Sequence, residues 1–230
     1  MIKSPPNIFY DKKHKNLAFI VAVSDSYINE LHNNWDKLKD WDVCVLTNRP
    51  EEFKHAFYVE EYRDFIFSYV QKFTFALRAC LKFQRGGFLL DADDLVQLTP
   101  DFYNNFHYYV NFHTVEYWWT PRDQIKSSEL GVNLQRYADE FGIDLLDIDP
   151  VCEQAFYIPY NNKLVDILYE VERIKPIIEY TSLFNDHFNY LGHGEGLAVA
   201  LASKIHNTEI KLFDINPFNL EFWDNRELFL

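Results

Sequence analysis

A run of seven apolar residues, Leu17–Val23 (LAFIVAV), restricts the fold of this chain more than any other feature of its sequence. Continuous apolar runs that are rich in β-branched residues are typical of strands buried on both faces of a parallel sheet. The segments Asp42–Asn48 (DVCVLTN) and Phe88–Leu90 (FLL) have the same character, and positions 56–62 predict a further short strand. The first hundred residues therefore supply several candidate strands of one sheet.

Helical patterns separate these candidate strands. The residues Ser24–Ser26 (SDS) can cap a helix whose apolar positions follow at helical spacing between 28 and 38. A longer helix is predicted for positions 64–84, where apolar residues recur along one face, and Gly86 or Gly87 would end it in the left-handed conformation. Strands that alternate with helices indicate an α/β fold with a central, mostly parallel mixed sheet flanked by helices.

The second half of the chain predicts a mixture of strands and helices. One or two strands are expected within 107–120, and single strands within 153–161 and 209–215. Helices are expected within 161–174 and 194–207, and 127–143 is either a helix or a loop with a helical piece. No repeat, low-complexity stretch or linker interrupts the sequence. We therefore expect one domain that covers residues 1–230.

The composition limits the classes of function that suit this chain. A net charge of −13 disfavours binding to bulk nucleic acid or to an anionic membrane, which needs clustered Lys and Arg, but it suits a site that recruits a divalent cation. Cys44, Cys80 and Cys152 lie far apart in apolar surroundings, which predicts buried thiols rather than a zinc site or a disulfide framework. The first residues lack a signal-peptide pattern and no window of about 18 apolar residues occurs, so we expect a soluble, cytoplasmic protein without a transmembrane segment.

Three carboxylates, Asp91, Asp93 and Asp94, directly follow the strand predicted at 88–90. Ligands of open α/β sheets bind beyond the carboxyl ends of the strands, and this position therefore favours a functional site. Mg²⁺ and Mn²⁺ take oxygen ligands and often leave positions open for substrate phosphates. A cation bound by Asp91 and Asp93 would relieve the repulsion between them. The alternative is an acidic turn whose charges face water.

The segment 77–102 (LRACLKFQRGGFLLDADDLVQLTPDF) resembles the DXD region of nucleotide-sugar glycosyltransferases of the GT-A fold, with Asp91-Ala92-Asp93 at the motif. The resemblance implies a GT-A-like, Rossmann-type domain in which 17–100 bind the nucleotide sugar and 101–230 face the acceptor. It also implies Mn²⁺ or Mg²⁺ as the cofactor and a nucleoside-diphosphate sugar as the donor, a UDP-sugar being the commonest case. The acceptor would be a glycan or another hydroxyl compound, and the residues around the motif favour retaining families.

The same resemblance assigns roles late in the chain. Glu195 lies between two glycines at the start of a predicted helix, where many of these enzymes have an acidic residue beside the acceptor hydroxyl or the anomeric carbon. Glu195 and Asp93 are therefore the catalytic candidates, although a first-turn acid is also common for purely structural reasons. His193 is a candidate third metal ligand or phosphate contact, but the histidine of the family usually comes further downstream.

In the resembled fold, residues at the ends of the first two strands hold the base and ribose. The resemblance therefore makes these positions candidates, namely Val23, Asp25, Thr47, Asn48 and Arg49. Lys72 and Arg78, on the helix before the motif, are candidates for the diphosphate. Glu153 is a candidate near the acceptor, and Trp118 and Trp119 could stack on a sugar ring. The ordinary structural alternatives are polar loops at the strand ends, a solvated helix face for the two cations, and core packing for the tryptophans.

Three other classes of protein share parts of this pattern. A phosphatase of the haloacid dehalogenase type also has D-x-D after a parallel strand, but its nucleophile normally follows the first strand of the domain, whereas Asp91 comes later. A nucleotidyltransferase typically has a glycine-rich loop after the first strand, and 21–27 (VAVSDSY) contains no glycine. A non-catalytic module that keeps the same fold and binds glycans or nucleotide sugars is the remaining alternative.

Overall fold

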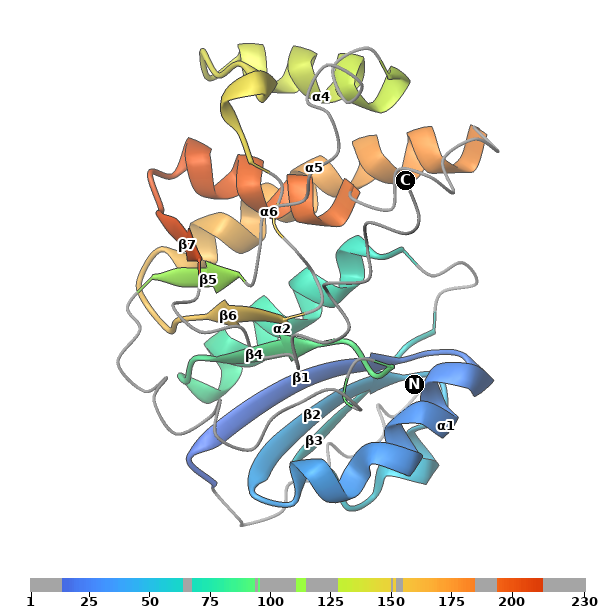
Figure 1. The fold of residues 1–230 in the computed structure, drawn as a ribbon. Helices are drawn as coiled ribbons and strands as arrows, with labels where there is room; N and C mark the ends of the chain where they lie inside the picture. The colour runs from blue at the N-terminus through green and yellow to red at the C-terminus, as the bar shows by residue number, and fades with distance from the viewer. Residues whose placement is uncertain are drawn as a thin grey trace, which may run out of the picture.

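The computed structural model describes residues 14–63, 68–93, 95, 111–114, 128–149, 151, 155–184 and 194–212 (Figure 1). The strands are β1 (Asn16–Ala22), β2 (Trp41–Thr47), β3 (Tyr58–Glu61), β4 (Gly87–Leu90), β5 (Phe112–Thr114), β6 (Ala155–Ile158) and β7 (Ile210–Leu212). The α-helices are α1 (Asp25–Asn34), α2 (Val70–Phe83), α4 (Glu129–Asp139), α5 (Leu164–Phe184) and α6 (Gly194–Ile205). Short 3₁₀ helices are η1 (Trp35–Leu38), η2 (Pro50–Phe53) and η6 (Leu145–Asp147).

The seven described strands form one mixed sheet in the order β3-β2-β1-β4-β6-β5-β7. Strand β1 is parallel to β2 and to β4, and β2 is parallel to β3. Strand β6 is antiparallel to both of its neighbours, β4 and β5, and β5 is parallel to β7. Six of these seven strands therefore run in the same direction, and the predicted α/β fold with a mostly parallel mixed sheet is confirmed as a Rossmann-like arrangement.

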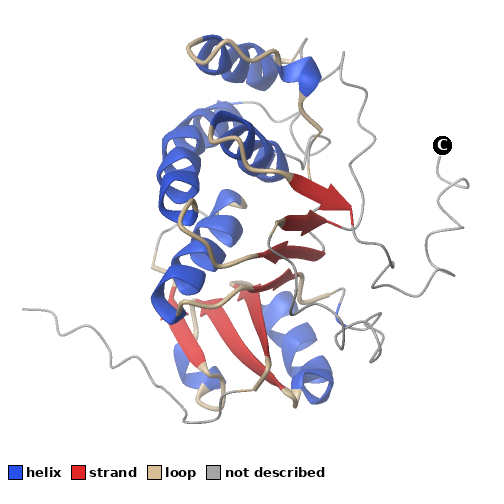
Figure 2. Ribbon diagram, turned by 90° about the vertical axis from the view of Figure 1, so that its left-hand side faces the viewer, coloured by secondary structure: helices blue, strands red, loops and turns tan. Residues whose placement is uncertain are grey.

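Helices cover both faces of this sheet, as the apolar runs require (Figure 2). Side chains alternate along β1, so that Leu17, Phe19 and Val21 pack in one buried cluster with apolar residues of α2, α5 and α6. Ala18, Ile20 and Ala22 pack in a second cluster, on the other face, with residues of α1, η1 and η2. β1 thus lies at the centre of the fold because both of its faces are apolar.

The helix predicted at 64–84 is present, but its predicted glycine end is wrong, and positions 64–67 lie outside the described residues. Helix α2 begins at Val70 and ends at Phe83, and positions 68 and 69 are described but are not helical. The left-handed residue at the end is Gln84, with φ of 52°, and neither Gly86 nor Gly87 adopts a positive φ. The helix therefore ends before the glycines, which have a different role.

The two glycines before the carboxylates allow close packing of the central strands. A Cβ atom on Gly86 would lie 2.7 Å from the Tyr157 hydroxyl oxygen and 2.8 Å from the Ile158 carbonyl oxygen. A Cβ atom on Gly87 would lie 2.7 Å from the Leu17 carbonyl oxygen and 2.7 Å from the Phe19 ring. Gly87 lies directly against the backbone of β1 at Leu17, so a side chain there cannot be accommodated without moving backbone.

Substitution of Gly87 by alanine should lower the free energy of unfolding by about 2–3 kcal/mol, because overpacking at a rigid backbone contact is expensive. The matched control is Gly142→Ala, since Gly142 has φ of 69° and open space around it. There only the conformational strain of about 1–2 kcal/mol applies. Urea unfolding followed by circular dichroism measures both, and a smaller loss at Gly87 than at Gly142 would contradict this packing role.

The elements of the second half agree with their predictions where they are described. Helix α4 lies within 127–143 and α6 within 194–207, while α5 extends ten residues beyond the predicted end at 174 and contains Pro176. In 107–120 the structure describes a strand at β5, and most of the remaining positions lie outside the described residues. Within the part of the chain that the structure describes, no helix is long and apolar enough to cross a bilayer.

The cysteines that are described have the predicted environment. Cys44 and Cys80 are free and fully buried, and burial raises the pKa of both thiols. These two residues are therefore small core side chains rather than nucleophiles. Cys152 lies outside the described residues.

Candidate functional site

The carboxyl ends of β1 and β4 lie side by side because the two strands are parallel neighbours, with Ile20 paired to Leu90. After β4, Asp91 is half-buried and Asp93 is exposed. Ala92, between them in the sequence, is buried in the second core cluster. Beyond β1, Ser24 caps helix α1, and its hydroxyl accepts a hydrogen bond from the Tyr27 amide at 3.4 Å. The chain thus places both turns at one edge of the sheet.

Lys72 neutralises the first of these aspartates. It lies in the first turn of α2, and its Nζ donates to Oδ1 of Asp91 at 2.7 Å. The two side chains are only 12% and 20% exposed, so the ion pair is mostly shielded from water. Lys72 is therefore not on a solvated helix face. Burial raises the pKa of Asp91, although Lys72 lowers it in part, and Asp93 raises it further.

Glu195 is the second carboxylate near this ion pair. It lies in the first turn of α6 and is only 6% exposed. Burial raises the pKa of Glu195 to about 7, while the positive charge of Lys72 lowers it and the negative charge of Asp91 raises it. The first turns of α2 and α6 and the end of β4 therefore meet around Lys72. A carboxyl group whose pKa lies near neutrality is a common property of functional sites.

Two tyrosines that the sequence analysis did not select complete this group. Burial raises the pKa of Tyr27, and the charge of Asp93, together with Tyr69 and Asp91, raises it further, whereas Lys72 lowers it. The Lys72 ammonium lies 5.3 Å from the centre of the Tyr69 ring. Their positions carried a signal, because each tyrosine lies at or beside the start of a helix at the edge of the sheet. We call this set the rim cluster; it consists of Tyr27, Tyr69, Lys72, Asp91, Asp93 and Glu195.

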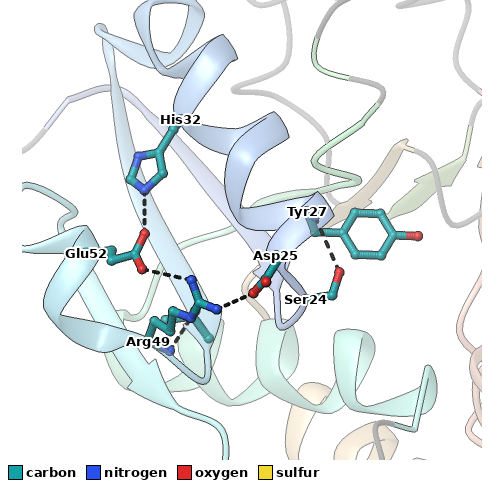
Figure 3. A network of polar contacts seen from close by, with 7 residues as sticks. Ser24, Asp25, Tyr27, His32, Arg49 and Glu52 are labelled. Carbon is teal, nitrogen blue, oxygen red and sulfur yellow. Dashed lines mark hydrogen bonds and ion pairs between the residues drawn. The ribbon is translucent and has the colours of Figure 1, made fainter.

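A separate polar network joins the ends of β1 and β2 (Figure 3). The Arg49 guanidinium forms an ion pair with Asp25 and donates to Oε1 of Glu52 at 3.3 Å. The other Glu52 oxygen lies 3.1 Å from Nε2 of His32, and this hydrogen bond is the main cause of the lowered pKa of Glu52. In Figure 3 the ring of Tyr27 points away from Arg49. The network and the rim cluster are thus two neighbouring groups at one edge.

The candidates for the base and ribose differ in their environment. Asp25 has a side chain that is 78% exposed, and it holds Arg49. Asn48 is exposed, and Val23 is half-buried against the core. Thr47 is fully buried, and its hydroxyl accepts from the Arg49 amide at 3.1 Å. Thr47 therefore shapes the turn after β2, and Asp25 and Asn48 are the candidates that a ligand can reach.

Arg78 lies outside the rim cluster. Its guanidinium forms ion pairs with Glu60 at 2.6 Å and with Glu172 at 3.5 Å. It is six residues beyond Lys72 on the same helix, which corresponds to about 9 Å along the axis. The structure thus brings Lys72, but not Arg78, to the carboxylates. Several further candidates lie outside the described residues, namely Asp94, Trp118, Trp119, Glu153 and His193.

The charge of the rim cluster is compatible with a bound divalent cation. Three carboxyl groups, on Asp91, Asp93 and Glu195, are opposed in this cluster by the single ammonium of Lys72. Burial raises the pKa of Asp91 and of Glu195, and Lys72 lowers both in part. Among the described residues, no three His, Cys, Asp or Glu side chains are close enough to hold a metal ion by themselves. Mg²⁺ is commonly held by one or two carboxylates together with substrate phosphates. Asp91 and Asp93 fit that mode of binding.

The chain was also compared with known proteins. No protein-family model, no curated protein and no solved structure matches it. The similarity to GT-A glycosyltransferases therefore rests on the motif at 77–102, and the site rests on the geometry of the rim cluster.

Proposed function

We propose that this protein is a metal-dependent glycosyltransferase that moves a sugar from a nucleoside-diphosphate sugar to a hydroxyl acceptor. The observation that carries the proposal is the convergence of Asp91, Asp93, Lys72 and Glu195 at the carboxyl edge of a mostly parallel sheet. This is the edge at which open α/β sheets bind ligands. The sequence resemblance at 77–102 supplies the class of reaction, and the GT-A fold is part of the proposal.

The donor side of the proposed site is formed by Asp91, Asp93 and Lys72. A divalent cation held by the two aspartates would stabilise the negative charge that develops on the leaving diphosphate. Lys72 would contact the diphosphate, since its Nζ already lies 2.7 Å from Oδ1 of Asp91. Because this ion pair is buried, water would screen the attraction between the Lys72 ammonium and a phosphate group less than at the surface.

Glu195 would act on the acceptor side. Its carboxyl group is buried, with a pKa of about 7, so both the protonated and the ionised forms are available near neutral pH. In a retaining enzyme, which the motif favours, Glu195 would position the acceptor hydroxyl or stabilise the developing positive charge of the sugar. In an inverting enzyme it would be the general base. The nucleoside would lie toward Asp25 and Asn48, at the ends of β1 and β2.

A thermal-shift screen tests this proposal. With uridine diphosphate, guanosine diphosphate and cytidine diphosphate, each with and without Mn²⁺, we expect one nucleotide to raise the melting temperature by about 5–10 °C at 100 times its Kd, and only with the metal. The Asp93→Ala variant should lose this shift. Asp40→Ala is the matched control, because Asp40 is an exposed aspartate before β2, at the opposite end of the strand. If no nucleotide stabilises the unmodified protein, the proposal fails.

The non-catalytic module is the alternative that this screen does not separate. Slow hydrolysis of the bound sugar nucleotide, followed by release of the free sugar, distinguishes the two. A glycosyltransferase should hydrolyse its donor in the presence of Mn²⁺, and Glu195→Gln should reduce the rate without removing the thermal shift. Binding with no hydrolysis of any tested donor would favour the module.

A further inference from the structure

Lys72 occupies a position that is electrostatically unusual for a lysine. It lies in the first turn of α2, the positive end of the helix dipole, where a cation is disfavoured. The contact with Asp91 at 2.7 Å compensates for this, and the side chain is only 12% exposed. The arrangement makes Lys72 the counter-ion of the first aspartate of the DXD motif.

The Lys72 ammonium and a bound divalent cation would therefore compete for the Asp91 carboxylate. A divalent cation that binds Asp91 would meet the Lys72 ammonium on that carboxylate, and the two positive charges would repel each other. The repulsion is relieved if Lys72 moves to another anion close by. The diphosphate of the proposed donor is such an anion, since phosphate oxygens accept strong, charge-assisted hydrogen bonds from lysine.

We infer that Lys72 is a displaceable counter-ion, which holds Asp91 in the free protein and transfers to the diphosphate when metal and nucleotide bind together. This inference rests on the proposed function and adds the order of events at that site. Metal alone binds weakly, because it must compete with Lys72. The diphosphate removes that competitor, so metal and diphosphate bind cooperatively, and linkage requires each to strengthen the other by the same factor.

Binding of Mn²⁺ to the full chain, measured by electron paramagnetic resonance of the free ion, tests this directly. Without nucleotide, Lys72→Met should bind Mn²⁺ about 10-fold more tightly than the unmodified protein, because the competitor is gone. At saturating Mn²⁺, the same variant should bind uridine diphosphate, or whichever diphosphate the screen selects, about 10–100-fold more weakly, the expected loss of a charge-assisted contact. The two affinities change in opposite directions, which a general disturbance of the site does not produce.

Two further variants serve as controls. Lys82→Met removes a lysine from the last turn of the same helix and should leave both affinities unchanged. Lys72→Arg keeps the charge and should bind Mn²⁺ alone as weakly as the unmodified protein, and circular dichroism verifies that each variant is folded. If the unmodified protein binds Mn²⁺ and the diphosphate but Lys72→Met binds both more weakly, the inference is overturned while the proposed function stands. If no diphosphate binds the unmodified protein, the proposed function has failed and the inference fails with it.

Discussion

Replacement of Glu195 by glutamine should stabilise this protein at pH 8 by up to about 3 kcal/mol, because the buried carboxylate is ionised there at a cost. The pKa of Glu195 is about 7 in the folded protein, against an ordinary value of 4.5. Between these two values the folded state holds a proton that the unfolded state has lost, so the free energy of unfolding falls as the pH rises. Glutamine has no proton to lose, and the variant should escape this decline.

The measurement is a set of urea unfolding curves between pH 4 and pH 8. The gain in the free energy of unfolding should be near zero at pH 4, should grow by about 1.4 kcal/mol per pH unit between the two pKa values, and should level off above pH 7. Glu129→Gln is the matched control, since Glu129 is also in the first turn of a helix but is exposed. It should change the free energy of unfolding by less than about 1 kcal/mol. A Glu195→Gln variant that is less stable than the unmodified protein at pH 8 would contradict the burial of an unfavourable charge.

This prediction also bears on function. Burial of the Glu195 carboxyl group raises its pKa, and buried groups with strongly shifted pKa values are concentrated at functional sites. If the proposed function holds, the same variant should lose about 100-fold or more in the rate of sugar transfer, the scale expected for a positioned acid or base. A gain in stability combined with a loss in rate would identify Glu195 as a functional residue.

The layered fold could be predicted from the sequence because its central strands are apolar on both faces. Leu17–Val23 has no polar side chain, and a segment of this kind is stable only between two layers of helices. The end of α2 could not be predicted in the same way. Glycine is the commonest residue at a left-handed helix end, yet Gln84 takes that conformation here. Gly86 and Gly87 are required instead by atoms of β1 and β6, which are distant in the sequence.

The candidate site was predicted in part, for a related reason. Asp91, Asp93 and Glu195 could be selected because strand ends and helix starts are local features of the sequence. The partner of Asp91 could not be selected from the sequence, because both Lys72 and Arg78 precede the motif on one helix. Only the packing of α2 decides which of them reaches the carboxylate. Tyr27 and Tyr69 were missed because an aromatic residue beside an apolar pattern is more often part of the core.

A second large effect is expected at the opposite end of the strands, where Asp42→Ala should lower the free energy of unfolding by about 3 kcal/mol, because it leaves a partly buried arginine without its counter-ion. Asp42 is 1% exposed, and its two oxygens accept from the His14 amide at 2.8 Å and from the Arg85 guanidinium. Arg85 also donates to the His14 carbonyl oxygen at 2.6 Å. This network ties the start of β1 and β2 to the segment between α2 and β4, and it contains no residue of the rim cluster.

A double-mutant cycle separates the ion pair from the other contacts. Arg85→Met should be destabilising by a similar amount, because it strands the buried Asp42 carboxylate, but the double variant should lose about 2 kcal/mol less than the sum of the two single losses. Asp42→Asn keeps an acceptor for the His14 amide and should lie between Asp42→Ala and the unmodified protein. Strictly additive losses in urea unfolding would show that Asp42 and Arg85 act independently. The network lies at the start of β4, whereas Asp91 and Asp93 follow its other end. Asp42→Ala should therefore weaken nucleotide binding only to the extent that it unfolds the protein.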